Sequence, residues 1–137
     1  MTDPILTVRF VQPCKPLTLN ERLHWRPKND RTQLWRYATA MAAVQASGPK
    51  GPSARRLPAA VVQCSFDVFG NYRRDPHNWF ATVKPVVDGL VQAGLWPDDT
   101  PEWVRTVEPR LTILPVPRRG QPLPQRWCTV AITPMEP

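Results

Sequence analysis

Cysteine is scarce in this chain, which has three among its 137 residues: Cys14, Cys64 and Cys128. They are far apart, odd in number and never in a C-x-x-C spacing, which argues against a structural zinc site and against a disulfide framework. We therefore expect buried or incidental thiols in a reducing compartment.

Long apolar runs are also lacking, and no segment approaches the roughly 18 consecutive apolar residues of a transmembrane helix. The first residues include Asp3 and Pro4 and are not a basic segment followed by a long apolar stretch, so we expect no secretory signal. The length suffices for one hydrophobic core, and we expect a single domain over residues 1–137.

Negative charge is in short supply, because 11 Asp and Glu stand against 18 Lys and Arg and leave a net charge of +7. A basic protein is attracted to polyanions, of which nucleic acid is the leading candidate. The alternative is a basic surface that serves only solubility.

Proline, by contrast, is abundant, with 18 residues that should shorten helices and stiffen loops. Residues 5–11 are rich in β-branched side chains and predict a first strand. Asp30 is the expected N-cap of a helix over about residues 31–46. The expected apolar face of this helix consists of Leu34, Ala38, Met41 and Ala42, with Trp35 beside them.

The second helix has two plausible starts. Asp75 and Pro76 fit the N-cap and first helical positions, but Pro85 would then lie inside the helix at a cost of about 3 kcal/mol. We therefore predict Thr82 as the N-cap and a helix that ends at Ala93, followed by a C′ glycine at 94. Residues 75–81 would then form an ordered loop.

The remaining segments predict strands. Residues 62–68 alternate between apolar and polar side chains, and residues 104–114 predict a strand interrupted near Pro109. A proline-rich basic turn over 115–125 leads to a last strand over 127–133, expected to be antiparallel to the one before it. The order β-α-β-α-β-β predicts an α+β two-layer domain with a mixed sheet packed against helices on one face.

The most informative segment is Arg73-Arg74-Asp75-Pro76-His77-Asn78, which follows the strand over 62–68. It is followed by Lys84, by Asp88 and by the run Ala93-Gly94-Leu95-Trp96-Pro97-Asp98-Asp99. Carboxylates among arginines in a basic chain indicate a site that handles a phosphate through a metal ion held by oxygen ligands.

These residues resemble the signature of the RusA family of Holliday-junction resolvases, in its actinobacterial and phage branch. The family pattern is an Asp-x-Asp-Asn after arginines, then a helix with Lys and Asp four apart, then Ala-Gly-x-x-x-Asp-Asp. Asp75 and Asn78 match its first and last positions, whereas His77 stands where the archetypal members have Asp. With the opening segment 17–25, the resemblance covers roughly residues 5–105.

The resemblance implies a divalent-metal-dependent endodeoxyribonuclease that resolves four-way DNA junctions by symmetric paired nicks during recombination and repair. It implies a homodimer, because a junction has near two-fold symmetry. It also implies a protein of the cytoplasm of a bacterium or a phage-infected bacterial cell, with no membrane partner.

The same resemblance implies a metal site of Asp75, His77, Asp98 and Asp99, holding Mg²⁺ or Mn²⁺. Imidazole is a poor ligand for Mg²⁺ and a better one for Mn²⁺, so we expect His77 to shift the preference toward Mn²⁺. His77 is alternatively a general base, a phosphate contact or a plain loop histidine. Asp75 and the pair at 98 and 99 are alternatively turn residues.

Lys84 and Asp88 are four residues apart and share one helix face. They form either a surface ion pair, or a catalytic lysine at the scissile phosphate with a carboxylate that orients it. The expected DNA contacts are Arg73, Arg74, Arg26 and Lys28. Trp25 and Trp79 either stack on exposed bases or pack in the core.

Two other functions are consistent with the same residues. One is a non-catalytic protein that binds branched DNA, in which His77 marks a lost metal site. The other is a structure-specific nuclease with a broader range of substrates, such as flaps, forks or RNA.

Overall fold

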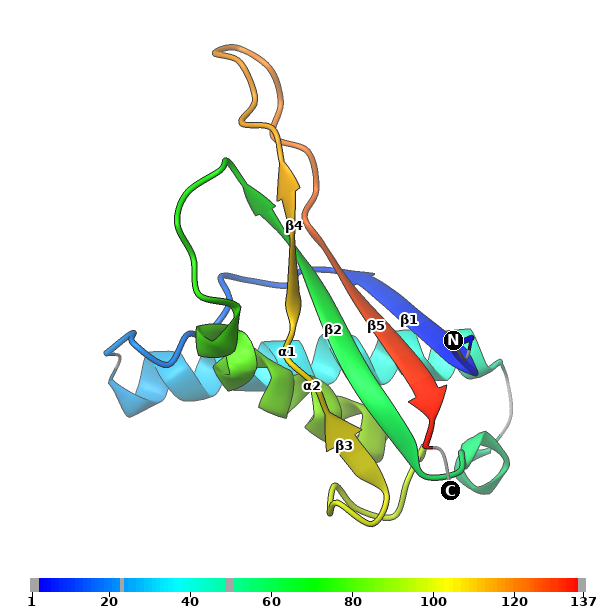
Figure 1. Ribbon diagram of the computed structural model, residues 1–137. Helices are drawn as coiled ribbons and strands as arrows, with labels where there is room; N and C mark the ends of the chain where they lie inside the picture. Colours follow the sequence, from blue (N-terminus) through cyan, green and yellow to red (C-terminus); the bar gives the residue numbers. More distant parts are fainter. Residues whose placement is uncertain (1–2, 23, 49–50, 136–137) are drawn as a thin grey trace.

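The computed structural model describes residues 3–22, 24–48 and 51–135. It is an α+β arrangement of one mixed five-stranded sheet and two α-helices, as predicted. Figure 1 shows the elements β1 (Leu6–Val11), α1 (Trp25–Ser47), β2 (Ala60–Phe69), α2 (Phe80–Gln92), β3 (Val104–Thr106), β4 (Arg110–Leu114) and β5 (Trp127–Pro134), besides the 3-10 turns η1 (Pro52–Arg55) and η2 (Pro76–Trp79).

The sheet has the order β1-β5-β2, with β3 and β4 one after the other along the other edge of β2. β3 and β4 run parallel to β2, and Pro109 separates them, which confirms the predicted interruption. The last strand runs antiparallel to the one before it, as expected, but the two do not pair, because β5 lies between β1 and β2. Its alternate residues Cys128, Val130 and Ile132 are fully buried, as a central strand requires.

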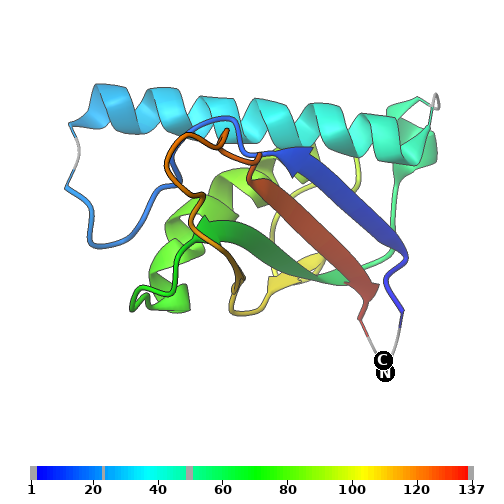
Figure 2. The ribbon, with the colours of Figure 1, turned by 90° about the horizontal axis from the view of Figure 1, so that it is seen from above.

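Both helices cover the same face of the sheet (Figure 2). Alternate residues of β2 are buried beneath them, and Trp35 of α1 meets Phe10 and Phe66 edge-to-face at centroid distances of 5.9 and 5.8 Å. Aromatic pairs in this geometry add to the stability that burial provides. The segment 115–125 projects beyond the sheet as a proline-rich turn between β4 and β5 (Figure 1).

The helix α1 begins earlier than predicted, at Trp25, and Asp30 is an exposed helical residue rather than the N-cap. Pro27 did not prevent the earlier start because a proline is tolerated in the first turn of a helix. The predicted apolar face is also wrong in part, since Leu34 and Met41 are exposed. The buried residues Trp35, Thr39, Ala40 and Ala43 form the face instead.

That face carries small residues because α1 packs closely against α2. A Cβ built on Gly89 of α2 would lie 2.5 Å from the carbonyl oxygen of Arg36 and 2.7 Å from the Cβ of Thr39. The helices therefore approach at a distance that only a glycine permits at this position.

The helix α2 begins at Phe80, directly after η2, so the expected N-cap at Thr82 and the expected loop over 75–81 are wrong. Pro85 lies inside the helix and is buried, so its packing offsets the hydrogen bond that it cannot donate. The predicted C′ glycine is confirmed: Gly94 has a φ of 99°. Its N–H donates to Val91, and that of Leu95 donates to Leu90, at 2.9 and 3.2 Å.

The three cysteines are free thiols, and Cys64 and Cys128 are buried, as expected. Burial raises the pKa of Cys64 to about 12. No helix within the described ranges is long and apolar enough to cross a membrane.

Candidate functional site

Three of the predicted residues converge on one point. The Nζ atom of Lys84 lies 3.1 Å from Oδ1 of Asp88, one turn along α2, and also contacts Oδ2 of Asp99 from the segment that joins α2 to β3. The hydrogen bond to Asp99, followed by the bond to Asp88, raises the pKa of Lys84, and Lys84 in turn lowers the pKa of Asp99. At neutral pH Lys84 is therefore an ammonium and Asp99 a carboxylate.

Asp98 and Asp99 are adjacent, but their side chains have different partners. Oδ1 of Asp98 accepts hydrogen bonds from the backbone N–H and the hydroxyl of Thr100, at 3.0 and 2.7 Å. These bonds lower the pKa of Asp98. Asp98 thus stabilises the turn that aims Asp99 at Lys84, rather than joining the cluster itself.

Lys84 and Asp99 line a cleft between α2 and β3, with a volume of about 510 Å³. Phe80, Val83 and Val87 of α2 form an apolar side, whereas Lys84, Asp99 and Arg105 supply the charges. A volume of this size is within the range of small-molecule and cofactor sites. Two cations that line one cleft suit a phosphate bound through charge-assisted hydrogen bonds.

Asp75 and His77 lie at η2, directly before α2. The Oδ1 atom of Asp75 accepts a hydrogen bond from the backbone N–H of His77 at 3.0 Å and caps the turn. The imidazole of His77 meets the ring of Phe80 edge-on, at a centroid distance of 5.2 Å, and Phe80 lines the cleft. His77 thus adjoins the cleft through Phe80, and the second carboxylate oxygen of Asp75 is not used by the cap.

The predicted metal ligands are not gathered into one cluster. Among the residues that the structure describes, no three His, Cys, Asp or Glu side chains are placed to share a metal ion. Mg²⁺ needs only one or two protein carboxylates, with water and phosphate oxygens for the rest. Asp99 fits that need, because it already contacts one cation, the ammonium of Lys84.

Arg74 holds the loop after β2 in place. Its guanidinium donates to the carbonyl oxygens of Phe69 and Gly70 at 2.6 and 2.8 Å, at the end of the strand. Arg74 was predicted to bind phosphate with both ends of its guanidinium, but the guanidinium binds the backbone instead. It adds positive charge to this loop. Of the other predicted DNA contacts, Arg73 is exposed in the same loop, whereas Arg26 and Lys28 are exposed in the first turn of α1.

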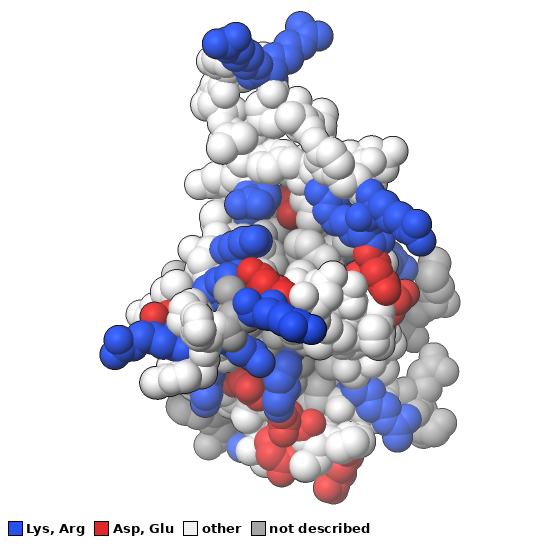
Figure 3. Space-filling view, turned by 90° about the vertical axis from the view of Figure 1, so that its left-hand side faces the viewer, with Lys and Arg blue, Asp and Glu red and all other residues white. Residues whose placement is uncertain are grey.

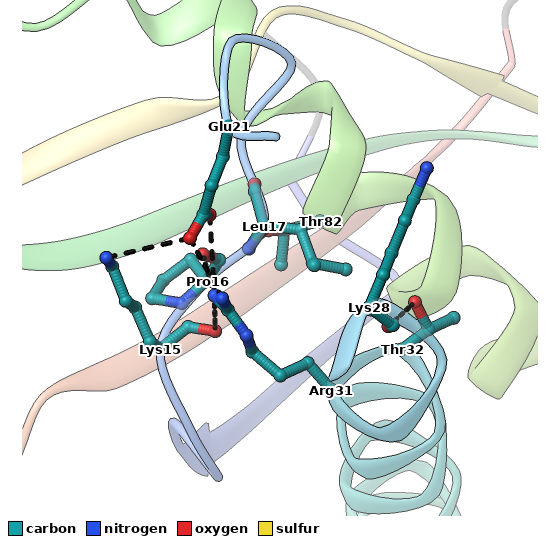
Figure 4. Close-up of polar contacts among 8 residues, drawn as sticks. All are labelled: Lys15, Pro16, Leu17, Glu21, Lys28, Arg31, Thr32 and Thr82. Carbon is teal, nitrogen blue, oxygen red and sulfur yellow. Dashed lines mark hydrogen bonds and ion pairs between the residues drawn. The ribbon is translucent and has the colours of Figure 1, made fainter. Parts of the chain in front are cut away.

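Sequence reasoning missed the contacts that fix the segment before α1 (Figure 4). Glu21 accepts hydrogen bonds from both terminal nitrogens of Arg31, at 2.8 and 3.4 Å, and Arg31 also donates to the carbonyl of Pro16 at 3.2 Å. Leu17 and the hydroxyl of Thr82 exchange two hydrogen bonds of 2.7 Å. These partners are between 10 and 65 residues apart, so no local pattern could have indicated them.

The face on which α1 and α2 both begin is predominantly basic. Figure 3 shows groups of Lys and Arg side chains spread over the upper and middle parts of this face, with some Asp and Glu between them. A larger group of Asp and Glu lies at its lower end, where the segment joining α2 to β3 lies in Figure 1. The N-terminus of a helix carries a partial positive charge that favours anions. Two helix starts and a surplus of cations therefore give this face a positive potential.

Comparisons with known proteins add little. No protein-family model matches the chain, and no curated protein does. Among solved structures, hydrogenase maturation protein HypE has 12% sequence identity and a TM-score of 0.31, over 99% of this chain and 33% of that one. This chain thus spans about a third of that protein, and a TM-score this low carries no argument about fold or function.

Proposed function

We propose that this protein is a divalent-metal-dependent endodeoxyribonuclease that resolves four-way DNA junctions by symmetric paired nicks. The observation that carries the proposal is the contact of Lys84 with both Asp88 and Asp99 at one cleft, which Lys84 and Asp99 line and which His77 adjoins through Phe80. These are the residues that carry the resemblance to the RusA family, and they come from separate segments of the chain.

In this proposal Lys84 is the residue that faces the scissile phosphate. Its raised pKa keeps it charged, and an ammonium beside the phosphate stabilises the negative charge that develops during hydrolysis. Asp88 positions Lys84 from one turn away on the same helix. Arg105, on the opposite side of the cleft, supplies a second charge for the DNA backbone.

Asp99 and Asp75 are the proposed carboxylate ligands of Mg²⁺ or Mn²⁺, with His77 beside them as the residue that favours Mn²⁺. The metal, when bound, would lower the pKa of its water and act as a Lewis acid on the phosphate. Lys84 is 63% exposed on a flexible aliphatic stem, so its ammonium can reach a phosphate bound in the cleft. Asp98 supports Asp99 through the turn with Thr100.

The basic face of Figure 3 is the proposed DNA-binding surface, with Arg73, Arg26 and Lys28 among its cations. Two such surfaces in a homodimer would match the two-fold symmetry of a junction. The proposal further places the protein in the cytoplasm of a bacterium or of a phage-infected bacterium.

A second candidate is a non-catalytic protein that binds branched DNA. It is favoured by one observation: the carboxylates of Asp88 and Asp99 are both engaged by Lys84. The two candidates differ in whether divalent metal supports cleavage.

The test is nicking of a labelled immobile four-way junction against a matched linear duplex, with Mg²⁺ and with Mn²⁺. We expect paired nicks in the junction, faster with Mn²⁺, and their loss in Asp75→Asn. The matched control is Glu108→Gln, which neutralises an exposed carboxylate between β3 and β4 and should nick normally. Tight junction binding without nicks under either metal would favour the second candidate, and equal cleavage of flaps and forks would favour a broader nuclease.

A further inference from the structure

A second groove, with a volume of about 270 Å³, lies at the end of β2 and shares no lining residue with the cleft. Five separate segments of the chain contribute to it. We call it the basic groove, and its defining residues are Lys15, Thr18, Phe69, Arg74, Trp79 and Arg126.

The basic groove is positively charged. Lys15, Arg74 and Arg126 line it, and within the described part of the chain no Asp or Glu does. The guanidinium of Arg126 lies 5.5 Å from the ring centroid of Phe69, and Arg74 is fixed by backbone carbonyls. The Lys15 side chain is 75% exposed and lies 3.7 Å from Glu21, a carboxylate that Arg31 binds more closely. Three cations around one groove attract an anion such as a phosphodiester.

Trp79 gives the groove an aromatic wall. Its ring packs against Phe66 in the core, at a centroid distance of 5.2 Å, which fixes its position. A fixed aromatic side chain beside cations is the arrangement on which proteins stack the bases of unpaired nucleic acid strands. A base paired within a duplex does not expose the face that such stacking requires.

The groove is smaller than the roughly 300–1,000 Å³ of typical small-molecule sites, and therefore suits one unit of a longer chain. Trp79 lines the groove and the next residue, Phe80, lines the cleft, so the groove and the cleft adjoin at the start of α2. We propose that the basic groove binds an unpaired nucleotide of the DNA substrate, its base against Trp79 and its phosphates beside Lys15 and Arg126. This inference rests on the proposed function, because it concerns the same DNA.

The test is the binding of a short fluorescent oligothymidine without divalent metal, measured by fluorescence anisotropy at several salt concentrations. For Trp79→Ala we expect a rise in Kd of about 10-fold or more, and for Trp79→Phe a smaller one, because phenylalanine retains a stacking surface. Lys15→Glu should weaken binding and reduce its salt dependence. The matched control is Tyr37→Ala, which removes an exposed aromatic side chain of α1 and should leave the Kd unchanged.

Wild-type affinity in both Trp79→Ala and Lys15→Glu would overturn the inference. Trp79→Ala removes a side chain that packs against the core and could impair folding. Lys15→Glu changes an exposed side chain, so it tests the groove without that risk. Displacement of the oligothymidine by a matched duplex as readily as by unlabelled single strand would also overturn it, because the ligand would not be an unpaired nucleotide. The measurement needs no cleavage, so a protein that binds through the groove but nicks no DNA would refute the proposed function and leave this inference standing.

Discussion

Replacing Thr82 by valine is expected to destabilise the protein much more than its small change in volume suggests. The Thr82 hydroxyl is fully buried, accepts a hydrogen bond from the backbone N–H of Leu17, and donates one to the carbonyl of the same residue. Valine preserves the shape of the side chain but leaves both of these backbone groups without a partner.

The size of the expected loss in stability follows from the burial of Leu17, which is 4% exposed. Each buried polar group left unsatisfied costs about 1–3 kcal/mol, which gives about 2–6 kcal/mol for the two. The segment of Leu17 lies near the surface and can shift to admit water, so we expect a loss of about 2–4 kcal/mol for Thr82→Val. Thr82→Ser keeps the hydroxyl and removes one methyl group, for a loss of about 1 kcal/mol.

Urea denaturation followed by tryptophan fluorescence measures both variants, with the midpoint and slope fitted separately. The expected order of stability is wild type, then Thr82→Ser, then Thr82→Val. Equal stability of the serine and valine variants, or a more stable valine variant, would show that the paired hydrogen bonds do not hold this segment to α2.

Other predictions concern packing, pH and reactivity. Gly89→Ala should lower the free energy of unfolding by about 1–3 kcal/mol, despite the better helix propensity of alanine. Gly51→Ala, whose Cβ meets nothing within 4 Å, should cause no loss. Equal midpoints of the two variants in urea denaturation would contradict the close packing of α1 and α2. Arg31 lowers the pKa of Glu21, so the ion pair contributes stability above the ordinary glutamate pKa of about 4.3 and loses it as pH falls through the lowered value. The difference in free energy of unfolding between wild type and Glu21→Gln should therefore be present at pH 7 and shrink below about pH 4, and a constant difference would argue against the pair. Cys64, with a pKa of about 12, should react with a thiol reagent at pH 8 only after unfolding, and rapid reaction in the native protein would show that the site opens.

The local sequence pattern correctly predicted the helices and strands whose positions depend on which side chains are buried or on a special backbone angle. The alternation over residues 62–68 located β2, and Gly94 located the end of α2 because that position requires a positive φ. The local pattern gave wrong boundaries where contacts between distant parts of the chain determine the start of a helix. Pro85 indicated a helix that starts later, but its burial and the preceding turn η2 allow the earlier start.

Strand order was a second failure of local pattern. β5 follows β4 in the chain, yet it inserts between β1 and β2, and nothing within its own sequence distinguishes the two placements. The apolar face of α1 was predicted at the wrong residues for a similar reason. The buried small residues of α1 pack against α2 as well as against the sheet, and the sequence of α1 does not show this second neighbour.

Three of the predicted site residues, Lys84, Asp88 and Asp99, meet in the structure, but their geometry was not predicted. The spacing of Lys84 and Asp88 correctly placed both on one helix face, and the structure adds Asp99 to them. The different roles of Asp98 and Asp99 depend on the turn with Thr100, which adjacency in sequence does not reveal. The metal ion and the DNA contacts stay predictions.

The most direct test of the central claim is the rate of junction nicking by Asp99→Asn compared with Asp98→Asn, at saturating Mn²⁺. The two variants remove the same charge from adjacent residues, but only Asp99 contacts Lys84 in the cleft. The account predicts a loss of about 100-fold or more for Asp99→Asn and a loss of less than about 10-fold for Asp98→Asn. Equal rates in the two variants, or the larger loss in Asp98→Asn, would contradict the assignment of the cleft as the site of phosphodiester hydrolysis.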